Sequence, residues 1–195
     1  MIPTTFITKV KSHFTTRFQE DPILVFAPGR INLIGEHTDY NDGFVLPAAI
    51  NKGIITAVAN SKEAICQIIS IDKNESFSIS LNNLNPIDSG GWKNYVLGVV
   101  SEIQQSGKNL KPFNLVFGGD IPEGAGMSSS AALENSLAFA LNELFDMGLS
   151  NHEIIHISQR AEHNFVGVKC GIMDQFSSMF GQKNQVFLLD CHTLE

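Results

Sequence analysis

The chain has 195 residues, of which 43% are hydrophobic and 17% charged, so it can bury one sizeable core and we expect a single domain over residues 1–195. Its formal net charge is −7, and it has no cluster of lysine or arginine. The positive surface that binding to a nucleic-acid backbone requires is therefore absent, and we expect no nucleic-acid partner.

The cysteines and the apolar runs indicate where the protein works. Cys66, Cys170 and Cys191 are widely spaced and form no CxxC pair, so neither a disulfide framework nor a thiolate zinc site is predicted. The chain start carries Lys9 and Lys11 where a secretory signal would be apolar, and no later run approaches the ~18 residues of a membrane span. We expect a cytoplasmic protein with no membrane partner.

The hydrophobic periodicity predicts an α+β fold in which one mainly antiparallel sheet packs with helices. An opening helix follows from apolar residues at every fourth position: Phe6, Val10, Phe14 and Phe18. Strands are then predicted over 23–27, 54–59, 64–71, 76–81, 113–119 and 186–190. Further helices are predicted over 92–105, 128–145, 151–164 and 173–179. We find no internal repeat or linker.

A glycine-rich segment joins the predicted strand 113–119 to the leucine-striped helix 128–145. Two glycines and three consecutive serines lie in its second half, which consists of Gly124, Ala125, Gly126, Met127, Ser128, Ser129 and Ser130. The glycines let the backbone turn tightly, the helix start offers unpaired N–H groups, and the hydroxyls add donors and a hard oxygen ligand for Mg²⁺. An anion site and an ordinary serine-capped helix after a turn are equally compatible with these residues. The Gly-Lys-[Ser/Thr] of a P-loop is missing.

Four polar residues follow the first predicted strand within seven positions: Glu36, His37, Asp39 and Asp42. Carboxylates and imidazole satisfy the hydroxyls of a polyhydroxylated ligand, so the cluster favours sugar binding. An acidic turn is the alternative. Asn41-Asp42-Gly43 has turn chemistry, and we interpret Asp42 as structural.

The segment from His152 to His156 matches HExxH, a zinc-binding pattern on a helix. However, Ser150 and Glu153 have the spacing of a capping box, and Leu149 and Ile154 that of a hydrophobic staple. We therefore predict that Glu153 caps the helix. Zinc, with the distant Asp174 as a third ligand, is the minor alternative.

Two later carboxylates, Glu162 and Asp174, lie in largely uncharged surroundings. One could hold Mg²⁺ while the other orients a hydroxyl, the two acidic tasks of phosphoryl transfer. Two surface charges are the alternative reading. Asp174 favours function, because an unpaired carboxylate in a Met/Phe-rich helix is costly to bury.

Taken together, three of these segments resemble the galactokinases of the GHMP small-molecule kinase family. The resemblance lies in GRINLIGEHTDYNDGFVLP, IPEGAGMSSSAALE and VGVKCGIMDQF, and it spans nearly the whole chain. It implies a fold like domain 2 of ribosomal protein S5. It also implies phosphorylation of the C1 hydroxyl of α-D-galactose by ATP with Mg²⁺, in a protein that is monomeric at full length.

The resemblance also implies residue roles. Asp174 would orient or accept the proton of the C1 hydroxyl, with Arg30 beside it. Galactose would be held by Glu36, His37, Asp39, Gly171 and Asp174. Residues 124–130 would cradle the triphosphate, and Trp92 and Tyr95 would flank adenine, with core packing as the alternative for these two rings. Mg²⁺ would be held by Glu162 and Ser130, with Ser129 as the competing serine.

Members of this family are about twice as long as this chain, and their second domain closes over the cleft. The resemblance therefore implies that the chain is the N-terminal portion of such a kinase. Two alternatives stay open: a galactose- and ATP-binding sensor without catalysis, and a kinase for another sugar such as galacturonate or arabinose.

Overall fold

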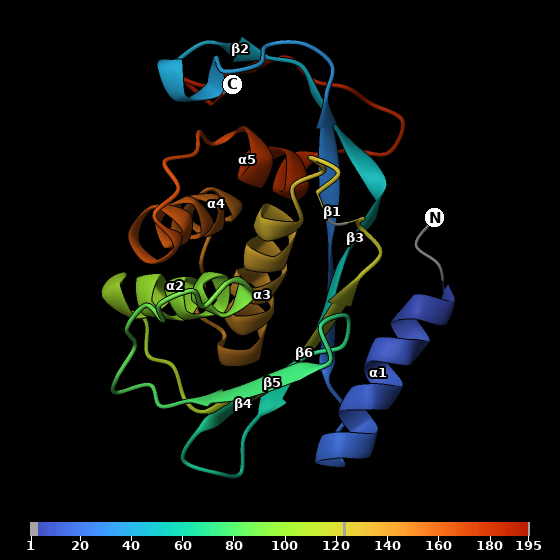
Figure 1. The fold of residues 1–195 in the computed structure, drawn as a ribbon, viewed down its shortest axis with the longest axis vertical. Helices are drawn as coiled ribbons and strands as arrows, with labels where there is room; N and C mark the ends of the chain where they lie inside the picture. The colour runs from blue at the N-terminus through green and yellow to red at the C-terminus, as the bar shows by residue number, and fades with distance from the viewer. Residues whose placement is uncertain (1–3, 123, 195) are drawn as a thin grey trace.

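The computed structural model describes residues 4–122 and 124–194, and Figure 1 shows their arrangement. The helices are α1 (Thr4–Phe18), α2 (Trp92–Gln105), α3 (Ser129–Phe145), α4 (Asn151–Ala161) and α5 (Met173–Phe180). The strands are β1 (Ile23–Asn32), β2 (Phe44–Val45), β3 (Pro47–Asn60), β4 (Cys66–Ser70), β5 (Glu75–Ile79), β6 (Phe113–Gly119) and β7 (Leu189–Asp190). The 3₁₀-helix η1 (Asp39–Asn41) and the π-helix η2 (Glu162–Val166) complete the elements.

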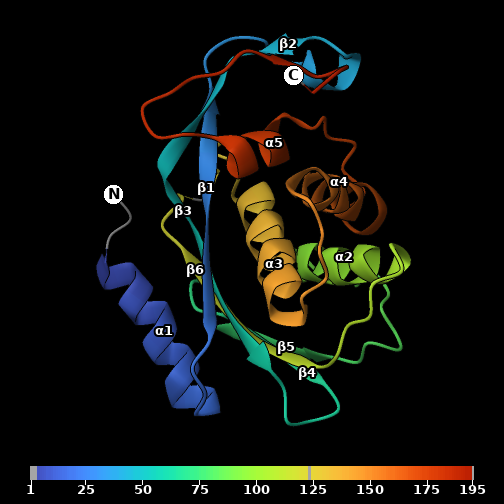
Figure 2. The same cartoon turned by 180° about the vertical axis from the view of Figure 1, so that it is seen from behind.

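The main sheet has five strands in the order β1-β3-β6-β4-β5. Its neighbours pair antiparallel except β4 and β6, which are parallel. Helix α1 covers one face, and α2 to α5 lie on the other (Figures 1 and 2). The predicted α+β fold with a mainly antiparallel sheet is confirmed.

Strand β3 is buried from Gly53 to Ala59 because both faces of the sheet are covered. Ile54 and Val58 belong to the core under α2, α3 and α4, whereas Ile55 and Ala57 pack in the cluster under α1. A strand covered on both faces appears in sequence as a continuous apolar run rather than an alternation. This explains the run from 54 to 59.

Strand β1 continues five residues beyond its predicted end at 27, to Asn32. The register against β3 shifts between Pro28 and Arg30, as in a β-bulge. Proline and glycine are tolerated at such an irregularity, where a ladder hydrogen bond is lost and the strand bends. The first residues of the motif that begins at Gly29 therefore lie on a rigid strand.

Helix α4 begins as predicted and ends earlier. The capping box is present, because Ser150 Oγ accepts from Glu153 N at 3.2 Å and Glu153 Oε2 accepts from Ser150 N at 2.8 Å. The predicted helix to 164 instead widens into η2 after Ala161, where Gly167 N donates to Glu162 O at 2.9 Å. Such π-turns are rare, and sequence periodicity does not reveal them.

A small second sheet consists of β2 and β7. The predicted strand 186–190 is correct only for Leu189 and Asp190, and β2 was not predicted. Two-residue strands have too few positions to show a periodicity. Among the described residues, no helix has the length and apolar character needed to cross a membrane.

Helices α2 and α4 approach closely at Gly98, where an added Cβ would lie 2.8 Å from Ala161 Cβ. Alanine favours a helix over glycine by about 1 kcal/mol, but overpacking costs about 1–3 kcal/mol. We expect Gly98→Ala to lower the free energy of unfolding in urea, and Gln105→Ala, on the exposed side of α2, to change it little. A Gly98→Ala protein as stable as the wild type would contradict this packing.

Candidate active site

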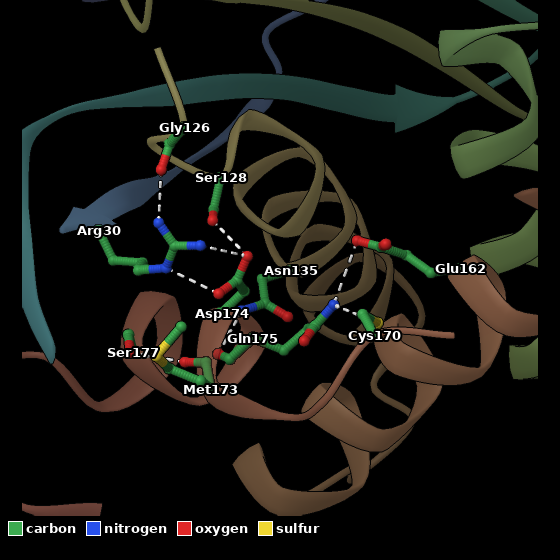
Figure 3. Close-up of polar contacts among 10 residues, drawn as sticks. All are labelled: Arg30, Gly126, Ser128, Asn135, Glu162, Cys170, Met173, Asp174, Gln175 and Ser177. Carbon is green, nitrogen blue, oxygen red and sulfur yellow. Dashed lines mark hydrogen bonds and ion pairs between the residues drawn. The ribbon is translucent and has the colours of Figure 1, made fainter. Parts of the chain in front are cut away.

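Three segments that are distant in the sequence meet at one ion pair (Figure 3). Arg30, near the end of β1, donates from Nε to Asp174 Oδ1 at 2.7 Å and from Nη2 to Asp174 Oδ2 at 2.8 Å. Asp174 lies in the first turn of α5. The third segment is the glycine-rich loop, since Arg30 Nη1 donates to Gly126 O at 2.6 Å. Strand, loop and helix are thus joined by one guanidinium.

The loop is docked directly against β1. Arg30 N donates to Met127 O at 3.2 Å, and a Cβ on Gly29 would lie 2.4 Å from that same oxygen. Glycine is therefore required at position 29 for the loop to approach β1. The sequence alone does not reveal this requirement. Gly124 and Gly126 have φ of 69° and 65°, in the left-handed region that glycine adopts readily.

Ser128 connects the loop to the carboxylate. It caps α3 with φ of 55°, and its hydroxyl donates a short hydrogen bond to Asp174 Oδ2. Asp174 therefore accepts three hydrogen bonds, from two nitrogens of Arg30 and from Ser128. A carboxylate has about four lone-pair sites, so Asp174 can still accept one from a ligand.

A cavity of about 470 Å³ adjoins the loop. Trp92, Tyr95, Ser129 and Ser130 contribute to its lining. The Trp92 ring also packs edge-on against Phe77 and Phe117, and its Nε1 donates to Glu75 Oε2 at 3.2 Å. The Trp92 ring therefore packs against core residues and also forms part of the cavity wall. The two aromatics and the serines share one cavity, as a nucleotide site would require.

Glu162 lies at the start of η2 and is 5% exposed. Its carboxylate accepts from Gln175 Nε2 at 3.3 Å and from the side chain of Ser130. Burial raises its pKa, while the hydrogen bond from Ser130 lowers it. A buried carboxylate beside a hydroxyl is the hard oxygen donor set that Mg²⁺ takes, so these residues fit that ion. Among the described residues, no three His, Cys, Asp or Glu side chains are grouped to hold a metal.

Glu134 is a site residue that we did not predict. It is 0% exposed, and it follows Ser130 by one turn of α3. Burial raises its pKa well above the usual range, and the adjacent Glu162 raises it further. The only sequence signal is a carboxylate within an otherwise apolar helical stripe.

The predicted sugar-binding residues divide into two groups. Asp39 is close to the ion pair: burial and the charge of Asp174 raise its pKa, and Arg30 lowers it. Gly171 packs against Asp39, since an added Cβ would lie 2.2 Å from Asp39 Oδ2. Glu36 and His37 are exposed in the preceding turn.

His37 has another partner, because its Nδ1 lies 2.7 Å from the hydroxyl of Tyr40. Within the described residues, no hydrogen bond or ion pair joins Glu36 or His37 to Arg30 or Asp174. Asp42 has the left-handed backbone of a turn, with φ of 55°, which agrees with a structural role. The structure thus brings Asp39 and Gly171 to the ion pair and leaves Glu36 and His37 at the surface beside it.

The residues of the HExxH segment make contacts other than those that a zinc site would require. The ring of His152 packs against Phe176 and Phe180, and Glu153 closes the capping box described above. Burial and the charge of Arg160 lower the pKa of His156. Asp174, the third ligand of the zinc alternative, is engaged by Arg30 and Ser128.

Comparison with known proteins agrees with this geometry. Residues 12–60 match the galactokinase galactose-binding signature, and residues 94–182 match the GHMP kinases N-terminal domain. Galactokinase from Thermosipho africanus is 47% identical over 171 residues, which are 88% of this chain and 47% of that protein. Galactokinase from Glaesserella parasuis is 42% identical over 96% of this chain and 48% of that protein.

The crystal structure of Lactococcus lactis galactokinase complexed with galactose superimposes with a TM-score of 0.91. It is 34% identical and covers 97% of this chain and 50% of its own. The fold is that of a GHMP kinase N-terminal domain, whose family model matches a segment that includes the glycine-rich loop. The chain belongs to the GHMP kinase family, within its galactokinase branch. It spans about half the length of the curated relatives it matches.

The approach of the loop to β1 can be tested with Gly29→Ala. Because the new Cβ would clash with Met127 O, we expect the loop to move away and the Arg30 N–H to lose its acceptor. Amide hydrogen exchange should then be faster at Arg30, while β3 and β6 keep their protection. Unchanged exchange at Arg30 would show that the contact does not hold the loop.

Proposed function

We propose that the chain is the N-terminal half of an enzyme that transfers the γ-phosphoryl group of ATP to the C1 hydroxyl of α-D-galactose. The observation that carries the proposal is the Arg30–Asp174 pair, because it sits directly against the glycine-rich loop at the N-terminus of α3. A helix start with exposed backbone N–H groups binds phosphate, and a carboxylate with a free lone pair binds a hydroxyl. The two reactants would meet at this point.

Galactose as the acceptor is supported by the signature over residues 12–60 and by relatives that are named galactokinases. Asp39 lies near enough to Asp174 for their charges to interact, and Gly171 packs against Asp39. Both residues would hold sugar hydroxyls near Asp174. Glu36 and His37 are exposed next to these residues and are available to a ligand. We assign them to the outer hydroxyls of the sugar.

The proposed reaction forms a bond between the C1 oxygen and the γ-phosphorus, and the bond from that phosphorus to the bridging oxygen of ADP breaks. Asp174 accepts the hydrogen bond of the C1 hydroxyl, orients it toward phosphorus and receives its proton. Arg30 keeps two N–H groups beyond those that it gives to Asp174 and Gly126, and they face the developing phosphoryl charge. Catalysis then comes mainly from positioning.

Ser130 and Glu162 would hold Mg²⁺, which would offset the charge of the triphosphate. Ser130 is favoured over Ser129 because its side chain hydrogen bonds to Glu162. Residues 124–130 would cradle the phosphates, and the cavity beside Trp92 and Tyr95 would accept the base. These assignments place nucleotide and sugar on opposite sides of Asp174.

Asp174→Asn in the full-length protein tests the central role. The amide keeps the shape of the side chain but is a much weaker proton acceptor, so we expect kcat to fall by roughly 10²–10⁴-fold. Thermal unfolding and galactose binding by calorimetry should remain measurable and show an intact fold. Turnover at the wild-type rate in a coupled ADP-release assay would contradict the assignment.

Glu36→Ala tests the sugar side. We expect the KM for galactose to rise by roughly 10–100-fold, because one hydrogen bond to a charged group contributes ~1.5–3 kcal/mol, whereas the KM for ATP stays unchanged. Glu143→Ala, on the far end of α3, provides a matched loss of a surface carboxylate. An effect confined to ATP would refute the placement of Glu36.

The same assay separates the alternative functions. Release of ADP with galactose, but not with galacturonate or arabinose, supports a galactokinase. Release with another sugar alone would favour a different sugar kinase. Binding of galactose and ATP without ADP release would favour a sensor.

A further inference from the structure

The glycine-rich loop begins at Asp120, at the point where the ladder between β3 and β6 ends. The last pair of the register is Ile54 with Gly119, so Gly53 and Asp120 would form the next pair. The backbone N–H of Asp120 donates to Gly53 O at 3.1 Å, as in a regular antiparallel pair. In return, however, Gly53 N donates to Asp120 Oδ1 at 2.9 Å. A side-chain carboxylate thus replaces the main-chain acceptor.

This replacement lets the chain leave the sheet without leaving a buried N–H unpaired. Gly53 is buried, so its N–H needs an acceptor, and Asp120 O would be that acceptor in a continued ladder. The Asp120 carbonyl instead accepts from Lys52 Nζ at 3.2 Å. The first residue of the loop is therefore held to β3 through its N–H, its carbonyl and its carboxylate.

The loop is consequently tied to the sheet at both ends. At its second end, Arg30 N on β1 donates to Met127 O. At its first end, Asp120 ties it to β3, which is the neighbour of β1 in the sheet. The residues between these ends, from 124 to 126, are exposed. The two docked ends therefore decide where the exposed N–H groups of the loop lie.

We propose that Asp120 is a positioning residue for nucleotide binding, because its carboxylate sets the direction in which the glycine-rich loop leaves the sheet. The inference rests on the proposed function, in which residues 124–130 cradle the triphosphate. Asp120 acts through the backbone of the loop and needs no contact with phosphate or sugar. A loop that is held in its binding conformation loses less entropy when the ligand binds, so the effect falls on nucleotide affinity.

The charge of Asp120 is not what this role requires. Asp120 Oδ2 lies 3.7 Å from Lys52 Nζ, and the two side chains are 28% and 44% exposed. Ion pairs with such access to water contribute little to stability. The oxygen of an asparagine amide can accept from Gly53 N as the carboxylate does. Asparagine should therefore replace Asp120 in this role, and alanine should not.

The test compares Asp120→Ala with Asp120→Asn in the full-length protein. Asp120→Ala removes the acceptor, and we expect a roughly tenfold rise in the KM for ATP with the KM for galactose unchanged. In Asp120→Asn the KM for ATP should stay within about threefold of the wild type, because only the exposed ion pair is lost. Asp21→Ala is the matched control. It removes a carboxylate that pairs with Lys11 at 2.8 Å and should change neither KM.

Amide hydrogen exchange reports on the same contact without nucleotide. Asp120→Ala should speed exchange at Gly53, whereas Asp120→Asn should keep that amide protected. Thermal unfolding identifies any variant that fails to fold. If Asp120→Ala does, Asp120→Ser provides the same comparison, because its oxygen lies one bond nearer the main chain and is expected to fall short of Gly53 N.

Several results would overturn the inference. One is a wild-type KM for ATP, or wild-type exchange at Gly53, in Asp120→Ala. Another is an equal rise in Asp120→Asn and Asp120→Ala, which would assign the effect to the charge. Equal rises in the KM for ATP and for galactose would indicate a general loss of structure instead of a positioned loop. A wild-type protein that neither binds ATP nor releases ADP would remove the proposed function itself, so the two failures are distinguishable.

Discussion

The paired hydrogen bonds between Arg30 and Asp174 are the interaction on which the rest of the site depends. The two side chains are only 13% and 24% exposed, so both charges are largely removed from water. An ion pair in such surroundings is favourable only if its geometry is good and other hydrogen bonds satisfy the remaining groups. Gly126 O and the Ser128 hydroxyl provide them, and both belong to the glycine-rich loop. The ion pair and the loop therefore stabilise each other.

This dependence explains why the site is built from rigid elements. Arg30 lies on β1, Asp174 in the first turn of α5, and Ser128 at the cap of α3. Helices α3 and α5 both pack on β1 and on each other, so the three elements that carry these side chains are in direct contact. In the loop, Gly124, Ala125 and Gly126 are exposed, and the hydrogen bonds from Arg30 to Gly126 O and Met127 O tie the loop to β1. In the proposed reaction, which depends on positioning, the rigid elements would hold the acceptor hydroxyl and the exposed loop would receive the phosphates.

Features with a local cause could be predicted from the sequence. The bounds of α2 and β6 were correct, as was the capping box at Ser150, because each depends on neighbouring residues. The features that were missed arise from tertiary contacts. Gly29 is needed because Met127 approaches it, and the pKa of Glu134 is raised by burial and in part by Glu162, which belongs to another element. No window of local sequence contains both partners.

The charges around Asp174 also bear on how nucleotide would bind. Besides burial, the charge of Asp174 contributes to raising the pKa of Asp39 and of Glu162, and Arg30 lowers the pKa of Asp39. Three carboxyl groups therefore lie near a single guanidinium. A triphosphate would add more negative charge to the same place and would be repelled unless a cation came with it. Under the proposed function, this acidic site would favour a nucleotide that arrives with its divalent ion over free ATP, because that ion would neutralise the phosphates and would itself be attracted to Glu162.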